Sequence, residues 1–183
     1  HFGFVLTSHL GELIVIDPET GTIRQRVALP HDRQSENAPD AASPHILEPD
    51  KKGQVSYTGL IFSPDGRRIF LSNVNGSIKV FAVSPDGNVT PSHTFALPLA
   101  NAPRRAEEIP SGLALSPDGA RLYVCANLSN RLLEPDSASG RLLRTFEVGV
   151  APYDVVLVHD RAYVSNWGGR RPAPGDLTGP AGR

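Results

Sequence analysis

The sequence predicts an all-β protein, and three observations support this fold class. Residues 59–73 and residues 112–127 resemble each other, and each stretch consists of an apolar run, a Ser-Pro-Asp-Gly turn and a second apolar run. A weaker copy of the same pattern covers residues 152–166. Glycine and proline are frequent, with 17 of each among 183 residues, whereas aromatic residues make up only 7%. Turn residues placed regularly between short apolar runs are typical of repeated antiparallel strands.

The first repeat unit is expected to be incomplete. Residues 1–30 contain three strand-like runs, at residues 2–7, 12–17 and 22–29, and the run that should precede them is missing. A polar stretch with three prolines then covers residues 31–56 and is expected to be an insertion loop. Such a long connection is either functional or without fixed structure.

Two complete units follow. The first covers residues 57–97, and its strands are separated by Ser-Pro-Asp-Gly turns at residues 63–66 and 84–87. Proline suits the second position of such a turn, and glycine accepts the left-handed conformation that follows. A second insertion at residues 98–110 leads to the unit at residues 111–148, in which residues 131–136 form a degenerate third strand. Residues 149–166 supply half a unit, and residues 167–183 are expected to be a loop or the start of a missing segment.

Four-stranded antiparallel meanders that repeat along a chain are the blades of a β-propeller. The sequence therefore predicts a partial propeller of about three blades, and we expect it to belong to a larger, seven-bladed ring. The absence of methionine and the loop-like C-terminal residues favour a fragment of a longer protein. Because an open arc exposes apolar blade faces, we expect the isolated chain to be poorly soluble or oligomeric.

A meander places alternate turns on opposite faces of the disc. The tight Asp-Gly turns are expected on one face, and the two long insertions on the other, which we call the loop face. A ligand or partner is expected on the loop face. The candidate residues there are the three asparagines that end second strands and the charged or aromatic residues of the connections, namely Asn73, Asn127, Asn166, Trp167, Arg170, Arg171, Arg104 and Glu107. Turn chemistry is the alternative role for the asparagines, and simple packing or solvation the alternative for Trp167 and the arginines.

Several kinds of chemistry find no support in the sequence. The 18 Lys and Arg residues nearly balance the 19 Asp and Glu residues, so nucleic acid is not an expected partner. No apolar run is long enough to span a membrane. The six histidines are not spaced as metal ligands, and Cys125 is expected on a strand without a base beside it. We therefore predict no catalytic residue, no metal and no cofactor in this segment, and we expect Glu107 and Glu108 to be solvated.

The second complete copy resembles a known family. Its Ser-Pro-Asp-Gly turn, followed by Arg-Leu-Tyr-Val-Cys-Ala-Asn at residues 121–127, is similar to the YVTN-type β-propeller repeat. Residues 151–155 and 163–172 resemble the propeller part of bacterial proteins that join such a propeller to a C-terminal alkaline-phosphatase-like phosphoesterase domain. The resemblance implies a periplasmic or extracellular protein and places any metal site and nucleophile beyond Arg183.

Two functional hypotheses remain open. The first is a non-catalytic propeller scaffold or binding module within a larger bacterial protein that carries a phosphoesterase domain. The alternative is a lactonase-class propeller enzyme acting on a sugar lactone, because seven-bladed lactonases also resemble this repeat. That enzyme would need charged residues converging on the loop face, and Arg104, Arg105, Glu107 and Arg170 are the candidates in this segment.

Overall fold

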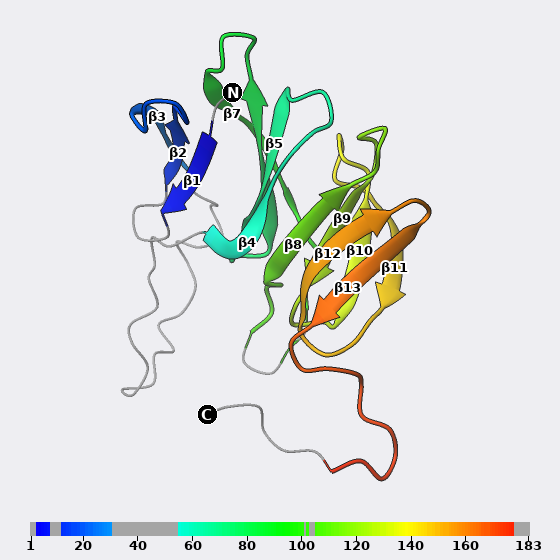
Figure 1. Cartoon of the computed structure of the whole chain (residues 1–183). Helices are drawn as coiled ribbons and strands as arrows, with labels where there is room; N and C mark the ends of the chain where they lie inside the picture. The colour runs from blue at the N-terminus through cyan, green and yellow to red at the C-terminus, as the bar shows by residue number, and fades with distance from the viewer. Residues whose placement is uncertain (1–2, 8–11, 31–54, 101, 103–104, 178–183) are drawn as a thin grey trace, which may run out of the picture.

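The computed structural model describes residues 3–7, 12–30, 55–100, 102 and 105–177. Within these residues the chain forms 13 strands in four antiparallel sheets, without a helix. The sheets fan out side by side in chain order (Figure 1). We call them blades 1 to 4. Blade 1 consists of β1 (Gly3–Thr7), β2 (Glu12–Ile16) and β3 (Ile23–Ala28), and blade 2 of β4 (Val55–Phe62), β5 (Arg68–Asn73), β6 (Ser77–Val83) and β7 (Val89–Ala96). Blade 3 consists of β8 (Pro110–Leu115), β9 (Leu122–Ala126), β10 (Arg131–Pro135) and β11 (Leu142–Glu147). Blade 4 consists of β12 (Pro152–Val158) and β13 (Arg161–Asn166).

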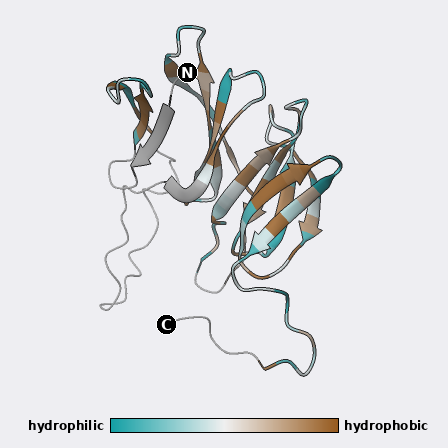
Figure 2. Cartoon of the chain, viewed as in Figure 1, coloured by the Kyte–Doolittle hydropathy of each residue, from teal (hydrophilic) through white to brown (hydrophobic). Residues whose placement is uncertain are grey.

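Each blade is a simple meander in which consecutive strands pair, so the predicted all-β blade architecture is confirmed. The first hairpins of blades 2 and 3 close through their Ser-Pro-Asp-Gly turns. Gly66 and Gly119 both have φ of +69°, which a residue with a Cβ rarely adopts. The hairpin of blade 4 closes instead at His159, which takes φ of +55° in a shorter turn. Figure 2 shows hydrophobic residues along the strands and hydrophilic residues at the turns.

The third strand of blade 3 forms despite its unusual sequence. β10 pairs with β9 on one side and β11 on the other, with an irregularity between Glu134 and Pro135. Glu134 is buried, and the Arg144 guanidinium donates two hydrogen bonds to its carboxylate, at 2.7 and 3.0 Å. This bidentate ion pair satisfies a charge that would otherwise be costly to bury.

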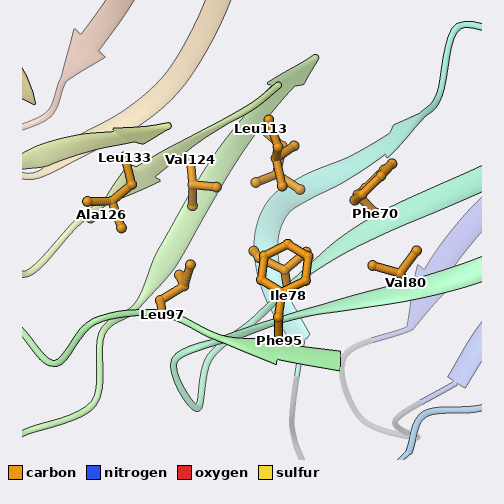
Figure 3. Close-up of a cluster of buried hydrophobic side chains, with 10 residues drawn as sticks. Phe70, Ile78, Val80, Phe95, Leu97, Leu113, Val124, Ala126 and Leu133 are labelled. Carbon is orange, nitrogen blue, oxygen red and sulfur yellow. The ribbon is translucent and has the colours of Figure 1, made fainter. Parts of the chain in front are cut away.

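Apolar residues between the blades form the core. Phe70, Ile78 and Phe95 of blade 2 pack against Leu113, Val124 and Leu133 of blade 3 (Figure 3). A second cluster joins blade 1 to blade 2, and a third joins blade 3 to blade 4. The innermost strand β8 serves two of these interfaces, because Leu113 faces blade 2 while Ala114 packs towards blade 4. This is the arrangement expected of a strand that lies between two blades.

Candidate binding face

Hydrogen bonds between turns define the two faces of the arc. On the turn face, the Arg68 guanidinium lies 3.4 Å from the carbonyl oxygens of both Ser137 and Gly119 and donates to each. On the loop face, the connection before β8 reaches two hairpin turns. Arg105 donates to the carbonyl of Val74, and the Glu108 carboxylate accepts from the backbone of the β9–β10 turn. Residues 105–110 therefore lie against the turns that follow β5 and β9.

The three asparagines occupy equivalent places but make different contacts. Asn73 is buried, and its side-chain amide donates to the Ser77 hydroxyl at 2.8 Å. The amide of Asn127 donates to the carbonyl of Pro152 in the next blade at 3.1 Å, and that of Asn166 donates to the carbonyl of Val164 at 3.2 Å. Asn73 thus closes its own turn, and Asn127 connects its blade to the next one. The carbonyl oxygen of Asn166 is buried and has no hydrogen-bond donor among the described residues.

The two arginines after β13 are both held by acids of the same chain. Arg170 forms a bidentate pair with Asp176, at 2.6 and 2.9 Å. Arg171 forms an ion pair with Glu147 and donates to the carbonyls of Val148 and Asn130. Hydrogen bonding from Arg131, reinforced by Arg171, keeps the pKa of Glu147 below its usual value. Asn166, Arg170 and Arg171 line one shallow hollow, so the structure brings three of the predicted residues together.

Trp167 is the most accessible aromatic residue at this end of the arc. Its side chain is 80% exposed and stacks on Tyr153, with ring centroids 5.0 Å apart and planes at 23°. Tyr153 lies on β12 and Trp167 directly follows β13, so the strand pair holds both rings. The sequence singled out Trp167 but not its partner, because only the irregular pairing at the start of β12 brings Tyr153 beside it.

The two neighbouring glutamates differ in environment, and the expectation that both are solvated is wrong. Glu107 is half-buried, whereas Glu108 is only 1% exposed. The Glu108 carboxylate accepts hydrogen bonds from the backbone N–H groups of Ile109, Leu128 and Ser129, at 2.9, 2.8 and 3.2 Å. Glu108 thus supports the loop face without facing a ligand. Arg104 and most of the insertion predicted at residues 31–56 lie outside the described residues.

The described residues offer little for covalent or metal chemistry. They contain no group of three or more His, Cys, Asp or Glu side chains that could hold a metal ion. Cys125 is buried between blades 3 and 4, and burial, with a smaller contribution from the Asp154 carboxylate, raises its pKa to about 12. A thiol with so high a pKa is a poor nucleophile near neutral pH. In the described part, no helix is long and apolar enough to cross a membrane.

Comparison with known proteins identifies the fold. No protein-family model and no curated protein sequence matches the chain. Among solved structures, it is similar to a putative 6-phosphogluconolactonase from Bacteroides fragilis, with a TM-score of 0.55, 19% identity and coverage of 90% of this chain and 39% of the other. It also resembles the periplasmic gluconolactonase of Pseudomonas aeruginosa, with a TM-score of 0.56, 23% identity and coverage of 84% and 38%.

A third β-propeller matches as well as these two. For the Cps50 (Swd1) β-propeller domain of Myceliophteria thermophila, the TM-score is 0.60 and the identity 15%, with coverage of 87% of this chain and 45% of the other. The chain thus spans 38% to 45% of the length of these three structures. Likenesses at such low identity show the fold alone. The chain folds as part of a β-propeller, and its neighbours in fold include a putative 6-phosphogluconolactonase, a periplasmic gluconolactonase and the Cps50 (Swd1) β-propeller domain.

Proposed function

We propose that this chain is a non-catalytic binding arc of a β-propeller and that its loop face receives the ligand or partner. The observation that carries the proposal is the exposed Trp167–Tyr153 stack beside the hollow lined by Asn166 and Arg170. Exposed aromatic rings with polar groups around them are characteristic of binding surfaces, because they add contact area at little cost in side-chain entropy.

The contacts of the other candidate residues support a scaffold more than an enzyme. Asn127 and Arg171 bridge neighbouring segments through backbone carbonyls, and Arg170 is neutralised by Asp176. A lactonase would require charged groups that converge on a reacting carbonyl with their hydrogen-bonding capacity available. Glu107 and Arg170 are the described candidates for that alternative, with Arg105 already committed to the carbonyls of Val74 and Glu107.

A lactone-hydrolysis assay separates the two hypotheses. The full chain is mixed with glucono-1,5-lactone, and the rate is compared with spontaneous hydrolysis. The scaffold proposal expects no acceleration. Turnover that falls at least about tenfold in both Arg170→Ala and Glu107→Gln, but not in the turn-face controls Arg161→Ala and Glu19→Gln, would establish the lactonase instead.

Two finer proposals rest on the resemblance at residues 163–172. We propose that the arc belongs to a bacterial protein with a YVTN-type propeller and a phosphoesterase domain, and that this protein acts outside the cytoplasm. Reading the coding DNA beyond both ends tests this association. A downstream domain rich in metal ligands supports it, and a reading frame without one contradicts it.

A further inference from the structure

In the interface between blades 2 and 3, the third strand of blade 3 and its turn to the fourth strand cover the outer strands of blade 2. Phe95 on β7 lies opposite Ile78 on β6 and is only 8% exposed. The β10–β11 turn of blade 3 lies directly on its ring, since a Cβ added to Gly140 would be 2.4 Å from the Phe95 Cγ. Gly140 also has φ of +72°. Glycine is therefore required there both by its conformation and by the close approach of the ring.

The same position in blade 3 has no such cover. Phe146 on β11 lies opposite Leu132 on β10, as Phe95 lies opposite Ile78, but it is 38% exposed. Arg121 likewise occupies the repeat position of Arg68. Arg68 donates to carbonyls of the next blade, whereas the Arg121 guanidinium forms an ion pair of 3.4 Å with Glu134 of its own blade. Both differences occur where blade 4 has β12 and β13 but, among the described residues, no third or fourth strand.

A cleft of about 550 Å³ lies at this place. Its lining includes apolar residues, namely Leu132, Phe146 and Val148 on blade 3 and Leu157, Ala162 and Val164 on the β12–β13 hairpin. It also includes the charged residues Arg121, Arg144, Asp160 and Arg161. Within the described chain, β12 is the only strand that pairs with β13, so the other edge of β13 is open to a further strand. An open strand edge beside a partly apolar cleft is suited to β-strand addition.

The turn after β13 has the geometry that starts a third strand elsewhere in the chain. The Gly169 N–H donates to the carbonyl of Asn166 at 3.1 Å, just as the Gly76 N–H donates to that of Asn73 at 3.1 Å. After Gly76 the chain continues directly into β6, but after Gly169 it turns away, and Arg170 pairs with Asp176. The hairpin is thus prepared for a third strand that residues 170–177 do not supply.

We propose that this cleft is the acceptor site for a β-hairpin of the same repeat, which adds antiparallel to β13 and completes blade 4. The occupant has the chemistry of a third-and-fourth-strand pair. It carries apolar residues at alternate positions, a turn with glycine over Phe146, and carbonyl oxygens in reach of Arg121. The interface between blades 2 and 3 supports this occupant, because there the third strand of blade 3 and its turn to the fourth strand bury Phe95 of blade 2.

The chain itself provides a probe for the test. A synthetic peptide of residues 130–148, which contains β10 and β11, is added to the full chain, and binding is measured by calorimetry. We expect saturable binding, together with slower hydrogen exchange of backbone amides on β13. Phe146→Ser in the chain should weaken binding about tenfold or more, because it removes the ring that the peptide covers. The control variant Leu99→Ser, at a residue that is 61% exposed and does not line the cleft, should bind normally.

A change in the peptide gives a second, independent readout that leaves the fold of the chain untouched. Replacing Gly140 of the peptide by valine introduces a side chain where φ is positive and where an aromatic ring lies underneath, and it should abolish binding. The proposal is overturned if the native peptide does not bind the folded chain, or if binding survives both Phe146→Ser and the valine peptide. A dimer that the peptide cannot dissociate, with β13 already protected, would assign the cleft to a second copy instead.

Discussion

At the scale of the single residue, Glu108 connects two segments of the loop face. Its carboxylate accepts hydrogen bonds from the backbone N–H of Ile109, just before β8, and from two backbone N–H groups in the β9–β10 turn, and the side chain is buried. Three donors share two oxygens, so a neutral amide with one oxygen cannot replace it. An unsatisfied buried donor costs about 1–3 kcal/mol.

We therefore predict that Glu108→Gln lowers the free energy of unfolding by about 1–3 kcal/mol, measured by urea denaturation. Glu107→Gln is the matched control, because it makes the same chemical change one residue earlier, at a half-buried side chain. That variant should change stability by less than about 0.5 kcal/mol. Equal effects in the two variants would contradict the role assigned to Glu108.

Residue-level predictions from the sequence were limited by information that only packing supplies. Nothing in the sequence distinguishes Glu107 from its neighbour, and the burial of Glu108 depends on where the connection crosses the β9–β10 turn. Asn127 was recognisable as a special position, but its acceptor, the Pro152 carbonyl, belongs to the next blade. Polar partners that are distant in sequence are therefore the part of the site that sequence reasoning misses.

At the scale of the element, the Ser-Pro-Asp-Gly turns use one hydrogen-bonding pattern three times. The serine hydroxyl donates to the aspartate carboxylate at 2.5 Å in each turn, for Ser63 and Asp65, Ser84 and Asp86, and Ser116 and Asp118. This hydroxyl contact is the largest cause that lowers the pKa of each aspartate below 3.8. The pattern is local, which explains why the sequence alone predicted these turns correctly.

These turns should make the fold sensitive to acid. Because the folded pKa of each aspartate is depressed, the unfolded chain binds protons first, and stabilisation is complete above pH 3.8 and declines as the pH falls through the folded values. The urea concentration at the unfolding midpoint should therefore be lower at pH 3 than at pH 6. Ser116→Ala should raise the pKa of Asp118 in an NMR titration and reduce this turn's share of the acid sensitivity. An unchanged Asp118 titration in that variant would show that the hydroxyl is not the cause.

At the scale of the whole molecule, the repeat predicted the order of the blades because each blade buries equivalent positions against the next. Gly59 and Gly112 mark the closest approach of the inner strands, since a Cβ at either position would lie within 2.5 Å of the following blade. Asp154 occupies the equivalent place in blade 4. The periodic glycine and apolar positions therefore predicted the order of the blades. Which residues are exposed at the end of the arc depends instead on which strands cover them, and the repeat does not give this.

The outward face of the β12–β13 hairpin carries exposed apolar side chains. Val156 and Tyr163 lie opposite each other on this face and are 54% and 52% exposed, while Val155 and Val164 pack towards blade 3. At the repeat position of Tyr163, Phe70 is fully buried by the next blade. An apolar surface of this kind promotes association in water.

We accordingly expect the purified chain to associate as its concentration rises, measured by size-exclusion chromatography with light scattering. The double variant Val156→Ser and Tyr163→Ser should shift the equilibrium towards monomer, because it removes apolar area from the outward face without touching the core. Leu99→Ser, which removes a comparably exposed apolar residue elsewhere, should leave association unchanged. A wild-type chain that stays monomeric at every concentration would contradict the assignment of this hairpin as an uncovered blade face. Association that persists in the double variant would place the contact on another surface, such as the cleft beside Phe146.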